Sequence, residues 1–215
     1  MTLKYIISLV ILLPALSHGQ QPLNLEAEKE AVTKCFNDYK EAVIEGQYQK
    51  AIELVDSNSL AYYQKLHQWV LQGSKTKVDS LNIFDKLTVL LIRQTVATEE
   101  LKNHDPQKLL IHSFESGMLG TETLKENSLG EILIDGNNAQ ARLLVNELKT
   151  PAYYQFYKTQ GEWRLDITSI FPQSAQAFQQ MAKRNKMDEN SYVLALVEAI
   201  SGEKPKANLW EPIIR

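Results

Sequence analysis

The chain has 215 residues, of which 44% are hydrophobic and 23% charged, a composition typical of globular proteins. This excludes disordered and collagen-like chains, and the single cysteine excludes an internal disulfide. The 23 basic and 26 acidic residues leave a net charge of -3, which does not suit a nucleic-acid-binding protein. We therefore expect one folded domain with a sizeable core and no nucleic-acid partner.

Residues 1–19 have the pattern of a signal peptide. Lys4 precedes an apolar run from Tyr5 to Leu16, and small residues follow at Ser17 and Gly19. The apolar run is shorter than the roughly 20 residues that a membrane-spanning helix needs. We expect cleavage after Gly19 and a secreted or periplasmic protein without membrane insertion, with an uncleaved anchor as the alternative.

Apolar residues at helical spacing fill the first half of the chain. Between Leu23 and Asp105 there is no proline, and Gly46 and Gly73 stand where helices could end. Four apolar stripes predict helices, the last of them after a polar break at 74–77, and these stripes cover 32–43, 48–55, 60–70 and 78–91. Asp105 and Pro106 predict the start of a further short helix.

After residue 117 the apolar residues recur at every second position, as in half-buried strands. Ile132 and Ile134 alternate on one side of a turn at 135–138, and Ala141, Leu143 and Val145 alternate on the other. A second hairpin is predicted at 153–167. This gives about four antiparallel strands over 124–168, followed by helices at 174–186 and 188–201 and by an extended tail at 203–215. Helices, then a meander, then helices predict an α+β fold rather than a parallel α/β sheet.

Two segments are similar to a known superfamily. Residues 31–64 combine a long helix, a glycine turn and a short helix led by an aromatic residue, and 153–169 (YYQFYKTQGEWRLDITS) contain Gly-x-Trp-x-x-Asp after a tight turn. Both resemble the NTF2-like (nuclear transport factor 2-like) superfamily, which includes ketosteroid isomerases and dehydratases. The resemblance implies an NTF2-like cone over 20–202, in which a curved antiparallel sheet of about four strands wraps the first helix. The helical stretch around 75–116 would then be an insertion, and 203–215 would lie outside the family core.

The resemblance implies either an enzyme or a binding module, because the fold alone does not fix function. An isomerase-type site needs a carboxylate base and a hydroxyl inside the cone. The candidate base is Asp166, with Tyr153 or Tyr157 as its partner. Strand alternation places Asp166 with Arg164 on the face away from Trp163, where a cross-strand salt bridge or a subunit interface is the structural alternative.

Aromatic residues crowd the segment 151–171 and predict either a ligand pocket or core packing. The candidate pocket residues are Tyr39, Tyr63, Tyr153, Tyr157 and Trp163. The leading hypothesis is an exported, non-catalytic domain that binds a small apolar ligand or a protein partner, with a cofactor-free isomerase or dehydratase as the alternative.

Other features bear on partners and stability. A homodimer through the exposed sheet face is a further expectation. The histidines have no metal-binding spacing and no paired cysteines exist, so we expect no metal site and no cofactor. Cys35 lies on an apolar helical stripe and is expected in the core. Trp210 in the tail is expected to pack back onto the domain.

Overall fold

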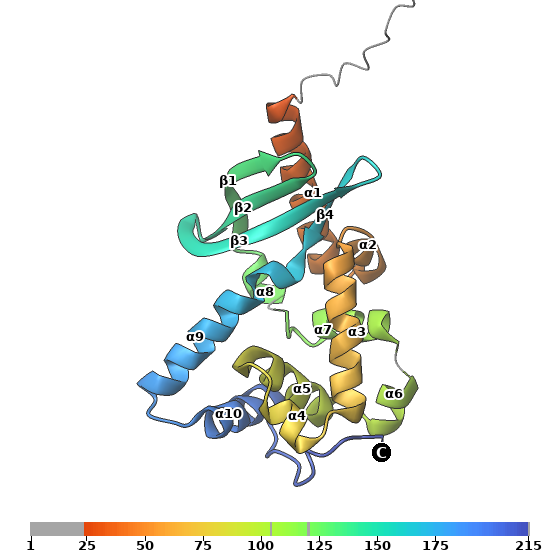
Figure 1. The fold of residues 1–215 in the computed structure, drawn as a ribbon, viewed down its shortest axis with the longest axis vertical. Coiled ribbons are helices and arrows are strands. Elements are labelled where there is room, and N and C mark those ends of the chain that lie inside the picture. Colours follow the sequence, from red (N-terminus) through yellow and green to blue (C-terminus); the bar gives the residue numbers. More distant parts are fainter. Residues whose placement is uncertain (1–23, 104, 120, 215) are drawn as a thin grey trace, which may run out of the picture.

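The structure is a computed structural model that describes residues 24–103, 105–119 and 121–214. The signal peptide expected at 1–19 lies outside this range. Figure 1 shows the chain as a sheet half at one end and a helical half at the other, with α9 running between them. The described residues form one four-stranded antiparallel sheet and a larger number of helices, which confirms the α+β class.

The first helix, α1 (Leu25–Ile44), begins where the Asn24 side chain accepts a hydrogen bond from the backbone N–H of Ala27. It ends before Gly46, whose φ of 72° suits a residue without a Cβ. One face of α1 is buried, as its apolar stripe predicts, and this face includes Cys35. The short helix α2 (Tyr48–Glu53) follows and packs against α1.

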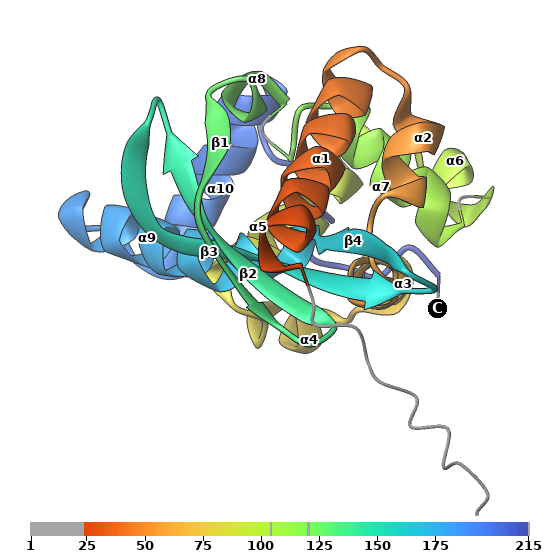
Figure 2. The ribbon, with the colours of Figure 1, turned by 90° about the horizontal axis from the view of Figure 1, so that it is seen from above.

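The sheet is a meander in the order β1-β2-β3-β4. Its strands are β1 (Asn127–Asp135), β2 (Asn138–Val145), β3 (Leu148–Thr159) and β4 (Glu162–Asp166). Irregular pairing between β1 and β2, and again between β2 and β3, interrupts the register. Such irregularities bend a sheet, and Figure 2 shows the sheet curving around α1. The two predicted hairpins are present, together with a turn at Asn146 and Glu147, both of which have positive φ.

Five helices lie between α2 and the end of the helical insertion. They are α3 (Ser57–Gln72), α4 (Lys75–Asp79), α5 (Ile83–Thr95), α6 (Thr98–Asn103) and α7 (Pro106–Glu115). Asp105 caps α7 and Pro106 is its first residue, as predicted. The predicted break at 74–77 is shorter than expected: α3 ends at Gly73, and the Ser74 side chain accepts a hydrogen bond from the Lys77 N–H and starts α4. A second break falls between α4 and α5.

Three further helical elements complete the described fold. The short α8 (Thr121–Leu124) leads into β1, and a 3-10 helix, η1 (Ile167–Ile170), follows β4. Helix α9 (Phe171–Arg184) begins earlier than the predicted residue 174, and α10 (Glu189–Ser201) ends at Gly202 as predicted. Helix α9 contacts η1 at one end and α5 and α10 along its length, so it connects the two halves.

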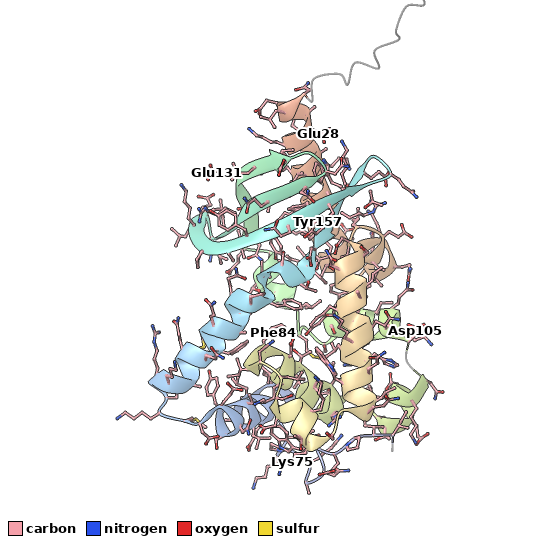
Figure 3. The ribbon with its side chains drawn as sticks, viewed as in Figure 1. Glu28, Lys75, Phe84, Asp105, Glu131 and Tyr157 are labelled. Carbon is pink, nitrogen blue, oxygen red and sulfur yellow. The ribbon has the colours of Figure 1, made fainter. Side chains whose placement is uncertain are left out.

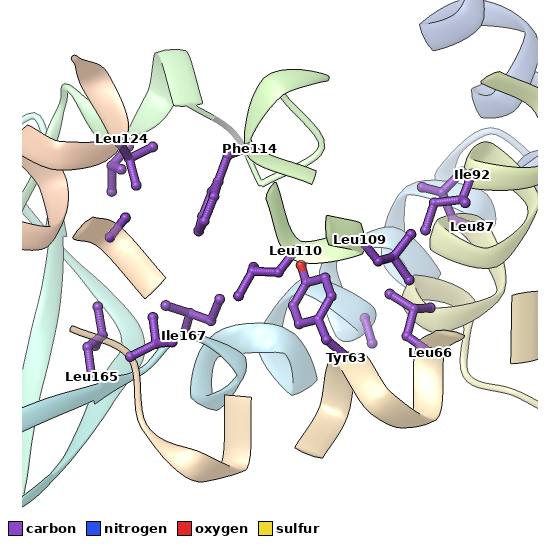
Figure 4. Close-up of a cluster of buried hydrophobic side chains, with 14 of the residues drawn as sticks. Tyr63, Leu66, Leu87, Ile92, Leu109, Leu110, Phe114, Leu124, Leu165 and Ile167 are labelled. Atoms are coloured by element: carbon purple, nitrogen blue, oxygen red, sulfur yellow. The ribbon is translucent and has the colours of Figure 1, made fainter. Parts of the chain in front are cut away.

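One continuous core joins the two halves. Figure 4 shows buried side chains running from Leu165 and Ile167 at the end of the sheet, past Tyr63, to Leu66, Leu87 and Ile92 in the helical half. Phe114 and Leu110 of α7 lie between these two groups. The helical insertion is therefore packed into the same core as the sheet.

The tail is held against the helical half. Leu209 is 2% exposed, and the N–H groups of Ile213 and Ile214 donate to the Leu71 carbonyl at 2.8 and 2.9 Å. Trp210 packs against the core, which confirms the expectation for this residue. Within the described residues, no helix has both the length and the apolar character needed to cross a bilayer.

Candidate functional site

A cavity of about 310 Å³ lies where the sheet half meets the helical half. Its walls come from α1, the end of α8, β1, β3, η1, α9 and α5, together with the segment after α7. Eight of its thirteen described lining residues are apolar: Phe84, Met118, Leu119, Leu124, Ile167, Ile170, Phe171 and Phe178. The other five are polar and uncharged: Tyr39, Thr123, Asn127, Tyr154 and Ser174. This volume and lining are typical of small-molecule sites, which combine an apolar wall with a few polar groups.

Local turns bring these distant segments together. Asp166 ends β4 and accepts a hydrogen bond from the Thr168 N–H at 2.9 Å, which turns the chain into η1 and α9. Gly117, with a φ of 70°, ends α7 and reverses the chain. The Leu119 N–H then donates to the Ser113 carbonyl, which holds the segment 118–119 against the cavity.

The polar side of the cavity has two buried tyrosines. Tyr39 of α1 and Tyr154 of β3 are each 4% exposed. Burial raises the pKa of Tyr154 to about 12, although a hydrogen bond with Asn127 opposes this shift. Burial, with a smaller effect of Tyr154 and Tyr63, also raises the pKa of Tyr39 well above its usual value. Both hydroxyls are therefore neutral at physiological pH and can donate a hydrogen bond.

The two tyrosines make different contacts. Tyr154 is hydrogen-bonded with Asn127, which is itself 9% exposed. The ring of Tyr39 packs edge-on against that of Phe114 at a centroid distance of 6.2 Å.

Aromatic rings form the apolar side of the cavity. The ring centroid of Phe84 lies 4.5 Å from that of Phe171 and 6.3 Å from that of Phe178. All three residues are half-buried, and Figure 3 shows Phe84 between the sheet half and the helical half. Offset aromatic rings of this kind supply flat apolar area at little conformational cost.

The five tyrosine and tryptophan candidates from the sequence do not lie in one place. Tyr39 lines the cavity, and Tyr63 is buried beside it in the core. Tyr153 lies opposite Arg142 in the sheet, and the guanidinium of Arg142 is 4.4 Å from its ring centroid. Tyr153 and Tyr157 therefore share the sheet face opposite to that of Tyr154, which packs on Phe36 of α1.

Trp163 lies in a second hollow, a groove of about 590 Å³ between α1, α2 and the β3–β4 hairpin. Charged side chains of both signs line this groove, so it differs in character from the cavity. The Trp163 ring nitrogen donates to Glu28 at 2.8 Å, and the Cys35 thiol donates to the Trp163 carbonyl at 3.2 Å. Cys35 is 6% exposed, as expected for a core residue, and burial raises the pKa of its thiol to about 11.

Asp166 does not form the salt bridge that strand alternation suggested. It is 7% exposed, and its Oδ1 accepts hydrogen bonds from the Thr168 hydroxyl at 2.6 Å and from the Ser59 hydroxyl at 3.4 Å. Burial, together with the nearby Asp56, raises its pKa. Alternation fails here because β4 ends at Asp166, and α3 supplies Ser59 as a partner. Asp166 does not line the cavity.

Tyr154 and Phe171 lie in the aromatic segment 151–171 but were not among the named pocket candidates, and Asn127, Phe84 and Phe178 were not predicted. Tyr154 follows Tyr153 directly, so the alternating pattern shows that one of them faces α1 without showing which one. Tyr154 pairs with Ala141 of the neighbouring strand, and Ala141 belongs to the alternating apolar positions predicted for that strand. This pairing could have identified Tyr154 as the tyrosine that faces α1. Phe84 comes from the helical insertion and Met118 from the segment that follows it, and nothing in their local sequence links them to the sheet.

The comparisons with known proteins identify no relative. No family model, curated protein or solved structure matches this chain. Among the described residues, no group of three or more His, Cys, Asp or Glu side chains could hold a metal ion. The functional argument therefore rests on the cavity itself.

Proposed function

We propose that this chain is an exported, non-catalytic binding protein with an NTF2-like core, and that it holds a small apolar molecule in the cavity between the two halves. The observation that carries the proposal is the cavity's lining, in which eight of the thirteen described residues are apolar and two are buried tyrosines. The packing of α1 on a bent antiparallel sheet supports the NTF2-like core. Export is supported by the pattern of residues 1–19.

The lining disfavours the isomerase or dehydratase alternative. Proton abstraction beside a carbonyl needs a carboxylate or another base within reach of the ligand. The described lining residues include no acid. Two acids next in sequence to lining residues are bound elsewhere, because Asp166 accepts from Ser59 and Thr168, and Asp85 accepts from the Tyr62 hydroxyl at 2.7 Å.

A fluorescent apolar probe tests the proposal. We expect N-phenyl-1-naphthylamine to bind the purified protein with a blue-shifted, saturable signal. Ser174→Phe would fill the cavity and abolish this signal, because Ser174 lines the cavity from α9. Ala177→Phe is the matched control, since Ala177 is an exposed residue of the same helix and its replacement leaves the cavity unchanged. Thermal unfolding of both variants would verify that they are folded.

Native mass spectrometry of the protein from the exported fraction of its host would report a retained ligand and the oligomeric state together.

Equal probe binding by Ser174→Phe and Ala177→Phe would contradict the cavity as the binding site. A dimer without any probe binding would instead favour the sequence-based alternative of a protein partner on the sheet face that carries Tyr153 and Tyr157. In that case, substitutions of these two tyrosines and not of Ser174 would dissociate the dimer.

A further inference from the structure

We propose that the turn between α9 and α10 docks the protein on the surface of a membrane that contains anionic phospholipids. The α9 tip, residues 181–187, places two exposed methionines beside three exposed cations, which are Lys183, Arg184 and Lys186. The inference does not depend on the ligand of the cavity. It concerns contact with a bilayer surface and not insertion across a bilayer.

Two large apolar side chains are exposed at the α9 tip. Met181 is 46% exposed and Met187 is 36% exposed. Figures 1 and 2 both show the end of α9 at an outer edge of the molecule. Apolar side chains at such an edge can enter the boundary between the headgroups and the acyl chains of a bilayer, and flexible methionines adapt readily to an irregular apolar surface.

A helix cap holds the side chains of the α9 tip in place. The Met187 N–H donates to the Ala182 carbonyl and the Lys186 N–H donates to the Lys183 carbonyl, both at 3.1 Å. This pair of bonds is a Schellman motif, and Lys186 has a φ of 54° within it. Glycine is the usual residue at this left-handed position, because a Cβ is unfavourable there. The motif therefore fixes a cation and a methionine next to each other on a defined backbone.

The three cations of the α9 tip are available to a partner outside the chain. No ion pair joins Lys183, Arg184 or Lys186 to another described residue. In contrast, Lys102 and Lys125 each pair with a glutamate three residues away. The chain as a whole has a net charge of -3, so the tip is a local basic exception. A cation near an anionic bilayer strengthens binding roughly fivefold.

The two acids that follow the α9 tip are compensated within the protein. Glu189 accepts a hydrogen bond at 2.8 Å from Lys86, whose side chain is only 3% exposed. Asp188 accepts from the Ser191 N–H at 3.0 Å and caps α10, where the positive end of the helix dipole offsets its charge. The three cations therefore determine the charge that the tip presents to a partner.

The small size of the α9 tip favours a lipid surface over an acidic protein. A stable protein–protein interface buries about 1,200–2,000 Å² and uses roughly 20–30 residues on each side. The tip offers the side chains of 181–187 only. A bilayer presents many anionic headgroups within a small area, and a few cations with adjacent apolar groups are enough for reversible contact.

Sedimentation with vesicles tests the proposal on the full chain at pH 7. One set of vesicles contains phosphatidylcholine alone, and the other contains equal parts of phosphatidylcholine and phosphatidylglycerol. We expect at least about tenfold stronger binding to the anionic vesicles. Sodium chloride at about 1 M should remove this difference, because the Debye length falls to about 3 Å. Binding to phosphatidylcholine alone measures the contribution of apolar segments elsewhere, including the run at 5–16.

Charge variants assign the binding to the α9 tip. The triple variant Lys183→Gln, Arg184→Gln, Lys186→Gln should bind the anionic vesicles about a hundredfold more weakly than the parent chain. A control triple variant makes the same change in net charge at exposed lysines of other elements and should weaken binding less than about threefold. Its substitutions are Lys65→Gln, Lys108→Gln and Lys149→Gln.

A methionine variant tests the apolar part of the contact. Met181→Ser combined with Met187→Ser should weaken binding to the anionic vesicles about tenfold and leave its salt dependence in place. The control is Leu133→Ser combined with Leu148→Ser, which removes two exposed apolar side chains from the sheet half and should bind as the parent chain does. Thermal unfolding of all variants would verify that they are folded.

The outcomes decide between the membrane and other occupants of the α9 tip. If the full chain did not sediment with the anionic vesicles, the membrane proposal would be overturned, and an acidic protein would become the candidate occupant. Equal losses in the two triple variants would also overturn it, because net charge and not the tip would then drive binding. Losses confined to the tip variants would support it. None of these results bears on dye binding in the cavity, so the two proposals are tested separately.

Discussion

The ring nitrogen of Trp163 donates a hydrogen bond to the Glu28 carboxylate at 2.8 Å, and this bond joins the closing hairpin of the sheet to the N-terminal part of α1. Lys158 on the neighbouring strand donates to both oxygens of the same carboxylate, at 2.6 and 2.8 Å. Figure 3 shows Glu28 at the sheet end of the molecule, well away from Phe84, and Glu28 does not line the cavity. The contact is therefore a structural anchor, and its removal should affect stability rather than binding.

The Glu28 anchor predicts a defined pH dependence of stability. The hydrogen bonds from Lys158 and Trp163 lower the pKa of Glu28 below its usual value. A carboxylate with a lowered pKa stabilises the folded state above its unfolded pKa and loses this contribution as the pH falls through the folded pKa. Glu28→Gln should cost about 1 kcal/mol of the free energy of unfolding at pH 7, after allowance for solvent screening, and less at pH 3.

Urea unfolding at the two pH values would measure this difference. Glu26→Gln is the control, because Glu26 is an exposed residue of the same helix turn whose ion pair is with Lys29. Equal losses for Glu28→Gln at both pH values would refute the electrostatic origin of the anchor.

Sequence periodicity predicted the elements of the fold better than it predicted the cavity. The stripe of α1, the start of α7 at Asp105 and Pro106, and the sheet strands follow from local spacing and turn residues, because each depends on neighbours within one element. The start of α4 at Lys75 was missed because four polar residues can form a helix turn when Ser74 caps it.

The cavity depends on contacts between segments that are distant in the sequence. Phe84 of the helical insertion meets Phe171 of α9 at a ring distance of 4.5 Å, across 87 positions of the chain that carry no shared pattern. Tyr39 was identified because it lies on the buried stripe of a single helix. Tyr154 was missed because its orientation depends on the register between β2 and β3, which alternation within one strand does not fix.

The thiol of Cys35 should react slowly in the folded protein. Burial raises its pKa from 9.0 to about 11, so the thiolate fraction at pH 8 is about a hundredfold lower than at the reference pKa. Iodoacetamide at pH 8 should label the native protein far more slowly than the same chain in guanidinium chloride. Rapid labelling of the native protein would show that the site opens.

The raised pKa of Cys35 also predicts that the free energy of unfolding falls as the pH rises above about 9, because the unfolded chain loses the thiol proton first.

Loss of the Arg93 side chain should destabilise the helical half. Its guanidinium is 5% exposed and donates to the carbonyls of Trp69, Val70, Gly73 and Leu209, which ties the end of α3 to the tail. Lysine cannot reproduce this fork of donors, so Arg93→Lys should cost about 2–3 kcal/mol. Proteolysis should then cleave the tail more readily. Arg184→Lys, at an exposed position of α9, should leave both the free energy of unfolding and the rate of tail cleavage unchanged.

Asp166 can be tested as a structural residue through the difference between two substitutions. Asp166→Ala removes the acceptor for the Thr168 N–H and for two hydroxyls, and should cost about 1–2 kcal/mol. Asp166→Asn keeps an acceptor oxygen and removes a buried charge near Asp56. At pH 7 it should therefore unfold within about 0.5 kcal/mol of the parent chain.

The pH dependence of the same variants tests the sign of the Asp166 shift. Because burial raises the pKa of Asp166, the folded state holds the proton more tightly than the unfolded state does. The parent chain should then gain stability relative to Asp166→Asn as the pH falls from 7 toward the unfolded pKa of this carboxyl. Probe binding in the cavity should be the same in both proteins, because Asp166 does not line it. If Asp166→Asn kept its stability but lost the bound probe, the carboxylate would act on the ligand, and the enzymatic alternative would regain support.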